Sequence, residues 1–422
     1  MAERISKAYQ DAVASSLLAG ASVIIGDKNG STLYSGSFGK ASLKQGRDDG
    51  FSTQTVCAIA SMSKLVTAVA VLQCVEKDLI DLDQDVRPLV PDMWTYGIIT
   101  AFDQDSNTAS FEADATPITL RMLLSHTSGF EYEALNPLLA EWRLSRNEGL
   151  ATGPTLHHQA VLPRVFRPGT GWAYGQGYDW AGKIIEVVMG MTLETYMQEH
   201  IWTPLGIQDA TFFPTQKPGI SSRLADISTL SDLGEPPAVD APLFKMLQDY
   251  TDCFGGAGIY ACAKDYYTFL SAVFCRDARL LSAASYTQLF CPQLDEAAER
   301  AFEKYIALSP FHTQILSLGV PRNIRRSWSF AGVVFLDGQP GRFEKGTHMW
   351  CGLTSPLWFM DHEAGICGTA LCQNLPSMAP KVVAVHEEMQ RGAMEFVNER
   401  IEESELYSAQ EPRRLKVNRL HL

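Results

Sequence analysis

The sequence predicts an α/β (α+β) protein with an antiparallel sheet that is built from both ends of the chain and flanked by the terminal helices. A mostly helical region is inserted between the two parts of the chain that form the sheet. Three observations predict this fold. A helix and a strand hairpin open the chain, strand-like runs and a long helix close it, and few convincing strands lie between them. We therefore expect residues 1–80 and 250–422 to form the sheet domain and residues 81–249 the helical domain, with the active site at their junction.

The N-terminal part of the sheet is predicted from a helix-like segment and a hairpin. Residues 3–18 are amphipathic, and residues 21–25 and 31–38 are strand-like. The turn between these strands, Asp27-Lys28-Asn29-Gly30, has the residue types of a hairpin. Residues 96–117 alternate weakly between apolar and polar residues, which predicts a second hairpin near the surface.

The middle of the chain is predicted to be mainly helical. Residues 118–129 predict a short N-capped helix closed by Gly129, and residues 178–190 show the clearest helical periodicity. A glycine turn at residues 255–260 leads into a strand and then a helix over residues 263–274. These glycines lack the strand before them and the acidic residue after them that a dinucleotide-binding loop requires, so we interpret them as a close approach of the backbone.

The C-terminal part predicts the rest of the sheet and the helix that covers it. A long helix runs from residue 380 to about residue 403, and residues 404–422 are predicted to be a polar tail. The strand-like runs occupy residues 327–336, 347–353, 357–360 and 366–371.

Composition and charge exclude several classes of protein. With 46% hydrophobic and 20% charged residues, the chain resembles an ordinary globular protein. Its net charge of −13, with no basic stripe, argues against nucleic acid or an anionic membrane as a partner. The N-terminus has no signal-peptide core, and no apolar run is long enough to span a bilayer. The nine cysteines lack metal-ligand spacing and are typical of reduced thiols, so we expect a cytoplasmic protein without a metal or other cofactor.

Ser61 and Lys64 form the motif from which a function can be argued. They lie three residues apart at the start of a predicted helix that continues through the apolar residues 66–75. Positions i and i+3 share one face of a helix, so the hydroxyl and the amine can meet. A serine hydroxyl becomes a nucleophile when a neighbouring base takes its proton, and a lysine with a lowered pKa can be that base. The N–H groups at the helix N-terminus would favour an anion forming there.

The same pattern also has a purely structural interpretation. Ser61 could cap the helix while Lys64 extends into solvent. A second match, Ser37 and Lys40, lies in strand-like sequence, where this spacing does not place both side chains on one face, and we discard it. His126 could be an alternative base, but we favour a role in ordering its loop because Lys64 already fills the base role.

Residues 169–180, rich in glycine and aromatic residues, supply the next candidate. Tyr174 lies just before a predicted helix, where its phenol could relay protons and its phenolate could be stabilised by a lysine ammonium. Packing with a satisfied hydroxyl is the alternative for any of the 14 tyrosines. Four aromatic residues near this segment and near the strand edge described next could line an apolar substrate pocket or pack in the core: Trp172, Tyr178, Trp180 and Trp350.

The third candidate element is a strand edge at residues 346–353. A backbone N–H at this edge, together with the N–H of Ser61, would form a two-donor oxyanion hole. Gly352 allows a close approach, and the N–H of Leu353 is our candidate donor. An ordinary buried strand is the alternative interpretation.

Taken in order, these elements resemble the serine β-lactamase-like superfamily of the class C and family VIII esterase type. Within it, the chain is most similar to the fungal lovastatin-type acyltransferases (simvastatin synthase-like transesterases), over about residues 20–400. The resemblance is carried by Ala60-Ser61-Met62-Ser63-Lys64-Leu65, Leu72-Gln73-Cys74, Thr119-Leu120-Arg121 through Gly129, Tyr174-Gly175, Asp179-Trp180-Ala181-Gly182-Lys183, Pro204-Leu205-Gly206-Ile207 and Cys253-Phe254-Gly255-Gly256.

The resemblance implies a β-lactamase/transpeptidase-like fold, with Ser61 as the nucleophile, Lys64 as the general base and Tyr174 as its partner in proton transfer. Two departures from the pattern matter. Gln176 replaces the asparagine of the usual Tyr-x-Asn motif, so the amide that contacts the acyl group is longer or displaced. β-Lactamases carry Lys-Thr-Gly where this chain has Trp350-Cys351-Gly352, and the missing carboxylate-binding lysine argues against penicillin hydrolysis.

The resemblance also implies a function. It implies acyl transfer from a thioester donor, held on a carrier protein, CoA or a small thiol, through acyl-Ser61 to a hydroxyl of a polyketide-like secondary metabolite. With water as the acceptor, the same residues would make a carboxylesterase or thioesterase. A catalytically inactive binding protein on this scaffold is a third alternative, and the intact set of Ser61, Lys64 and Tyr174 argues against it.

Overall fold

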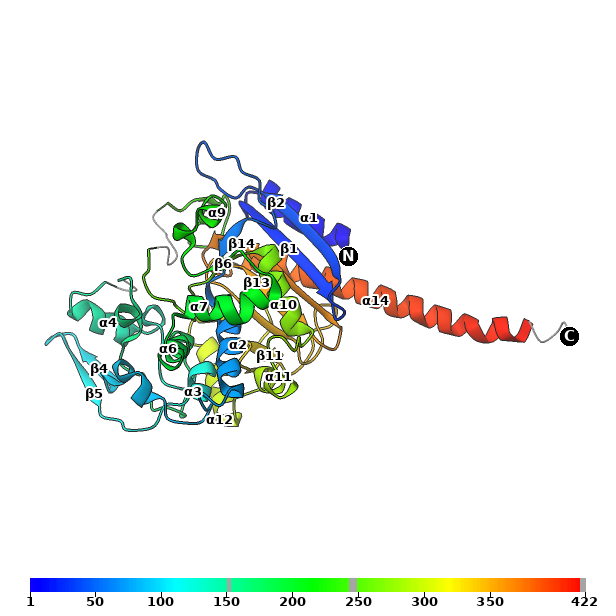
Figure 1. The fold of residues 1–422 in the computed structure, drawn as a ribbon. Helices are drawn as coiled ribbons and strands as arrows, with labels where there is room; N and C mark the ends of the chain where they lie inside the picture. Colours follow the sequence, from blue (N-terminus) through cyan, green and yellow to red (C-terminus); the bar gives the residue numbers. More distant parts are fainter. Residues whose placement is uncertain (150–152, 243–248, 418–422) are drawn as a thin grey trace.

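The computed structural model describes residues 1–149, 153–242 and 249–417, and its central element is a seven-stranded antiparallel sheet (Figure 1). The strand order is β10-β11-β12-β13-β14-β1-β2. Strand β1 pairs with β14 along its length, with Ile25 opposite Gly368, so the two ends of the chain meet within one sheet, as the sequence predicted. The strands are β1 (Gly20–Asp27), β2 (Thr32–Gly39), β10 (Arg326–Trp328), β11 (Val333–Phe335), β12 (His348–Cys351), β13 (Leu357–Asp361) and β14 (Ile366–Cys372).

Helices from three parts of the chain cover this sheet. Strand β1 is buried at every position, which requires cover on both of its faces. The terminal helices α1 (Ala2–Ala14) and α14 (Pro380–Val417) pack against each other, and α1 contacts β2. Helix α10 (Ala263–Phe274) contacts β1 and β14 (Figure 1). The sequence predicted all three helices from their periodicity.

Helix α2 (Ser63–Glu76) carries Lys64 and lies in the core. Its first twelve residues are buried, so it is a helix surrounded by protein rather than one with a single apolar face. A short 3₁₀ turn, Ala60–Met62, precedes it and contains Ser61. Helices α6 (Gly177–Met189) and α11 (Ala283–Phe290) both pack against α2.

The middle of the chain is mostly helical, as predicted. It contains the predicted hairpin, β4 (Ile98–Asp103) and β5 (Thr108–Glu112), and Ile98 of β4 also forms a bridge with Arg164. Besides α6, its α-helices are α3 (Leu120–Leu124), α4 (Pro137–Ser145), α5 (Leu156–Ala160), α7 (Leu193–Met197), α8 (Thr203–Leu205) and α9 (Pro218–Ser221).

Two small sheets connect this middle region to the ends of the chain. The first joins β3 (Val56–Ala58), β9 (Tyr260–Cys262) and β6 (Ala210–Thr211), and the second joins β15 (Asn374–Leu375), β7 (Ser228–Thr229) and β8 (Val239–Asp240). Because β6 pairs with β9 and β7 pairs with β15, and both partners lie outside residues 81–249, the predicted division into two domains stays a prediction.

Some predicted elements differ from the structure. Residues 327–336 are not one strand, because Ser329 and Gly332 form a tight turn between β10 and β11, closed by the Ser329 N–H on the Gly332 carbonyl at 2.8 Å. Helix α3 ends at Leu124, and His126 rather than Gly129 is the first residue after it in the left-handed region, with φ of 60°. Residues 283–316, for which we predicted no element, hold α11, α12 (Glu296–Ile306) and α13 (Pro310–Leu316).

The C-terminal helix is longer than the sequence predicted. Helix α14 continues to Val417 and projects from the body of the molecule, where a polar tail was expected from residue 404 (Figure 1). Residues 418–422 of the predicted tail lie outside the described residues. Within the described part of the chain, no helix combines the length and apolar character needed to cross a membrane.

Candidate active site

The structure brings Ser61 and Lys64 together as their spacing predicted. Lys64 Nζ lies 3.2 Å from Ser61 Oγ, at hydrogen-bond distance. The side chain of Ser61 is partly exposed, whereas Lys64 is only 1% exposed. A substrate can therefore reach the hydroxyl from solvent, while the amine behind it is shielded from water.

The turn that presents Ser61 has a strained backbone. Ala60 has φ of 46°, a left-handed conformation that costs about 1–3 kcal/mol for a residue with a Cβ. Neighbouring contacts hold the turn, since Ile59 N–H donates to the Ile259 carbonyl and Ser63 Oγ accepts the Ile259 N–H, both at 3.1 Å. No glycine marks this position, so the sequence did not indicate the strain. Such strain commonly occurs beside a reactive residue.

The amine of Lys64 makes hydrogen bonds to two neutral groups and lies near an aromatic ring. Its Nζ donates to the carbonyl of Gly256 at 2.8 Å and to the hydroxyl of Tyr132 at 3.3 Å, and it lies 4.6 Å from the ring centre of Tyr174. Burial lowers the pKa of Lys64 to about 7, although the negative charge of Asp179 opposes this shift. Near neutral pH a large fraction of the lysine is therefore the free amine that a general base requires.

Tyr174 lies next to both Ser61 and Lys64. Burial raises the pKa of Tyr174 well above its usual range, a shift that a hydrogen bond with Ser61 partly opposes. Trp350 Nε1 donates to the Tyr174 hydroxyl at 3.3 Å and orients it. This environment favours a neutral phenol that passes a proton on, rather than the lysine-stabilised phenolate that we considered from the sequence.

Sequence reasoning missed Tyr132. Its hydroxyl bridges Lys64 Nζ at 3.3 Å and Asp179 Oδ2 at 3.4 Å. Its backbone N–H donates to the carbonyl of Tyr174 at 3.1 Å, which joins the loops that carry the two tyrosines. Tyr132 and Lys64 are 68 positions apart, and no local pattern distinguishes this tyrosine from the others. Only the packing of the two loops identifies it.

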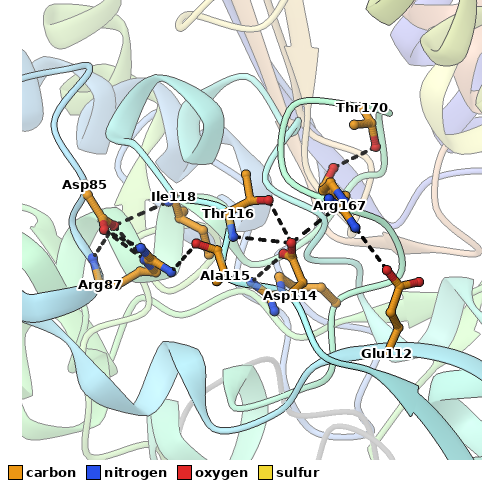
Figure 2. A network of polar contacts seen from close by, with 10 residues as sticks. Asp85, Arg87, Glu112, Asp114, Ala115, Thr116, Ile118, Arg167 and Thr170 are labelled. Carbon is orange, nitrogen blue, oxygen red and sulfur yellow. Dashed lines mark hydrogen bonds and ion pairs between the residues drawn. The ribbon is translucent and has the colours of Figure 1, made fainter.

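A network of polar contacts fastens the segment that leads to Tyr174. Figure 2 shows Asp114, after strand β5, beside Arg167, whose guanidinium also pairs with Glu112 at 3.0 Å. Asp114 also lies 3.5 Å from Arg164, a buried arginine whose backbone N–H donates to the Gly97 carbonyl. These contacts attach the β4–β5 hairpin to the active-site loop. Surface ion pairs add little stability alone, but a connected set restricts geometry.

His126 has the ordering role that we favoured. It is buried among four aromatic rings, those of Trp172, Tyr174, Tyr178 and Trp328. Its Nδ1 accepts the N–H of Gly175 at 3.4 Å. Burial and the charge of Lys64 lower the pKa of His126 well below its usual range, so the ring stays neutral and supports the loop.

The end of strand β12 lies against the turn that carries Ser61. A Cβ on Gly352 would lie 2.5 Å from the Ile59 carbonyl oxygen, so this approach requires glycine, as predicted. Gly352 N–H donates to the Pro356 carbonyl at 2.8 Å. In the described part of the chain the N–H of Leu353 has no acceptor, which leaves it available as the predicted oxyanion donor. Its role, with that of the Ser61 N–H, stays a prediction.

The predicted substrate-binding side chains are mostly buried. Tyr178 is fully buried, and its hydroxyl donates to the carbonyls of Leu124 at 2.8 Å and Phe330 at 2.9 Å. Trp172 packs against Phe302, with ring centres 4.3 Å apart. Trp180, Trp350 and Gln176 are also buried. The structure thus favours the packing interpretation for these residues, and their contact with a substrate stays a prediction.

We expect acylation of Ser61 to depend on the protonation of Lys64. Because the pKa of Lys64 is lowered to about 7, the free amine and hence kcat/KM should increase as the pH rises from 6 to 8 and then level off. The measurement is kcat/KM for a chromogenic ester that does not titrate in this range. A half-maximal pH above 9 would contradict the assignment of a buried, desolvated base.

Comparison with known proteins agrees with this geometry. The beta-lactamase family model matches residues 5–388. Lovastatin esterase of Penicillium rubens is 31% identical over 86% of this chain and 91% of that protein, and monacolin J acid methylbutanoyltransferase of Aspergillus terreus is 33% identical over 87% and 90%. A mutant of simvastatin synthase from Aspergillus terreus superimposes with a TM-score of 0.84 at 30% identity, covering 94% of this chain and 97% of that one. The chain therefore belongs to the beta-lactamase family.

Proposed function

We propose that this protein is a serine acyltransferase. It would move an acyl group from a thioester donor, through acyl-Ser61, to a hydroxyl of a polyketide-like acceptor. The observation that carries the proposal is the 3.2 Å contact between Ser61 Oγ and a buried Lys64 amine whose pKa is lowered to about 7. The named relatives support the direction of the chemistry, since one is named as a methylbutanoyltransferase of monacolin J acid and the other as a lovastatin esterase.

The reaction proceeds in two displacements. In the first, Lys64 takes the proton of Ser61 as Oγ attacks the donor carbonyl, and the proton passes to the leaving thiol with the help of the Tyr174 hydroxyl. The N–H groups of Ser61 and Leu353 would stabilise the oxyanion of each tetrahedral intermediate. In the second, Lys64 takes the proton of the acceptor hydroxyl as its oxygen attacks the acyl carbonyl, and the proton passes to Ser61 Oγ as the bond between Ser61 and the acyl group breaks.

The strand edge supports acyl transfer over penicillin recognition. Residues 350–352 are Trp350-Cys351-Gly352, so no cation stands where β-lactamases place the lysine that binds a carboxylate. Trp350 instead donates to Tyr174, and Cys351 lies near Lys64 as a neutral thiol whose pKa burial raises to about 12. The site therefore favours a neutral ester or thioester over an anionic lactam.

Hydrolysis is the second candidate function. Ser61 is partly exposed, so water can reach an acyl group attached to it. Lovastatin esterase, at 31% identity, shows that a similar protein carries the name of a hydrolase.

The identity of the acyl donor is a separate part of the proposal. We propose an acyl thioester on a carrier protein as the natural donor, with CoA or a small thioester as alternatives.

We expect an alcohol acceptor to accelerate loss of the acyl group. An acyltransferase must hold its alcohol in line with the acyl carbonyl and exclude water, which is present at ~55 M. Acyl-Ser61 made from a small thioester should therefore hydrolyse slowly and turn over at least about tenfold faster with a bulky, apolar polyketide alcohol. Single-turnover mass spectrometry with and without the alcohol measures this difference.

The control is the same alcohol with its hydroxyl methylated, which binds but cannot accept the acyl group. Rapid decay in buffer that no alcohol in a broad panel accelerates would assign the protein to the hydrolases.

A further inference from the structure

Asp179 is a buried carboxylate close to Lys64 to which sequence reasoning gave no role. It lies in the first turn of helix α6 and is 2% exposed. An acidic residue there often serves only to balance the dipole of its own helix. The carboxylate of Asp179, however, accepts hydrogen bonds from two other segments: Oδ1 from the N–H of Gly256 at 2.8 Å and Oδ2 from the hydroxyl of Tyr132 at 3.4 Å.

The same two groups also contact Lys64. The carbonyl of Gly256 and the hydroxyl of Tyr132 both accept from Lys64 Nζ, at 2.8 and 3.3 Å. The four residues therefore form a closed ring of hydrogen bonds, in which two bridges connect the carboxylate to the amine. A Cβ on Gly256 would lie 2.8 Å from Asp179 Oδ2, so the ring needs glycine at this position.

Among the titratable groups that face Lys64 in the described part of the chain, Asp179 is the only carboxyl group. Burial raises the pKa values of the three tyrosines and of the cysteine, and lowers that of the histidine, so all five are neutral. Burial also raises the pKa of Asp179, but the charge of Lys64 opposes this shift. The facing groups are Asp179, Tyr132, Tyr174, Tyr178, Cys351 and His126.

We infer that Asp179 is a positioning residue that controls the charge of Lys64 through the Tyr132 hydroxyl and the Gly256 peptide. When Ser61 Oγ bonds to the donor carbonyl carbon, its proton moves to Lys64 Nζ and the amine becomes an ammonium. The buried carboxylate stabilises this cation until the proton leaves with the thiol. The aspartate of a Ser-His-Asp triad stabilises an imidazolium in the same way. The kinetic part of the inference rests on the proposed acylation of Ser61.

Asp179→Asn tests the inference because it keeps the shape and removes the charge. Asparagine Oδ1 can still accept the Gly256 N–H. Without its anionic neighbour the Lys64 ammonium is less stable, so the pKa of Lys64 should fall by about one unit or more. We expect the acidic limb of kcat/KM to move to lower pH by the same amount, and the plateau to drop by about tenfold because the base is weaker.

The pKa of Lys64 is measured directly by NMR titration of protein labelled with ¹³C at lysine Cε, with Lys64→Arg used to assign the signal. This titration needs no substrate, so it tests the inference even if Ser61 is not acylated. Mass spectrometry separately detects whether Ser61 is acylated, which tests the proposed function. Glu131→Gln is the matched control. It removes another buried carboxylate, one residue from Tyr132, whose contacts are Tyr305 and Asn136, and it should leave the pKa of Lys64 unchanged.

An unchanged Lys64 pKa in folded Asp179→Asn, or an equal fall in Glu131→Gln, would overturn the inference. If Asp179→Asn does not fold, Tyr132→Phe tests the inference instead, because it removes the hydroxyl that bridges Lys64 and Asp179 and keeps the carboxylate. A smaller fall in the pKa of Lys64 is expected there, and no fall would overturn the inference.

Discussion

Replacing Ser61 by alanine is expected to abolish formation of the acyl-enzyme, with a rate loss on the order of 10⁴-fold or more. In the described part of the chain, the hydroxyl of Ser61 is the serine hydroxyl that contacts the Lys64 amine. The variant keeps the oxyanion donors and the rest of the site, so the activity that remains reports binding and electrostatic stabilisation alone. The mass shift of the protein after incubation with an acyl thioester measures the loss.

Ser37→Ala is the matched control for this experiment. Ser37 is the serine of the second Ser-x-x-Lys match, but its hydroxyl shares a hydrogen bond with Ser22, and Lys40 pairs with Asp48 on the surface. The two members of this match are thus engaged elsewhere, and Ser37→Ala should acylate at the rate of the unaltered protein. Labelling that persists in Ser61→Ala and disappears in Ser37→Ala would show that the other motif carries the chemistry.

Lys64→Arg is expected to be nearly as damaging as Lys64→Ala, with a loss of between about 10² and 10⁴-fold in the rate of acylation. Arginine keeps the positive charge but does not release a proton in the accessible pH range, so it cannot act as a base. Pre-steady-state acylation by a chromogenic ester measures the effect. If Lys64→Arg keeps most of the activity, Lys64 acts only through its charge, and the base must be sought at Tyr174 or His126.

The size of arginine calls for a second variant. Lys64 is buried, so a larger side chain could disturb the packing around it. Lys64→Met has a similar length, carries no amine and fits an apolar site, so it separates loss of the base from overpacking. Equal losses in Lys64→Met and Lys64→Arg, with unchanged thermal unfolding midpoints, would assign the effect to the missing base.

Local periodicity and turn chemistry were enough to predict much of the fold. The hairpin of β1 and β2 and helices α6 and α10 have clear local signals, and the structure contains each of them. The structure also contains the hairpin of β4 and β5, which the sequence indicated only by weak alternation. The prediction was wrong elsewhere. Residues 327–336 are mainly apolar, and Ser329 and Gly332 alone did not mark the turn between β10 and β11. Helices α11 and α13 are short, whereas α12 is a longer helix capped by Asp295 whose amphipathic pattern we did not use.

The sequence by itself was enough to predict the pairing of Ser61 with Lys64, because residues three apart at the start of a helix lie on one face. It was also enough to predict that both ends of the chain build one sheet. Only the tertiary structure decided what surrounds that pair. Tyr132, Asp179 and Gly256 come from three separate segments, and they meet at Lys64 because α2 and α6 pack together in the core. The lowered pKa of Lys64 has the same origin, since desolvation depends on how completely the folded chain excludes water from the amine, and no local pattern records that.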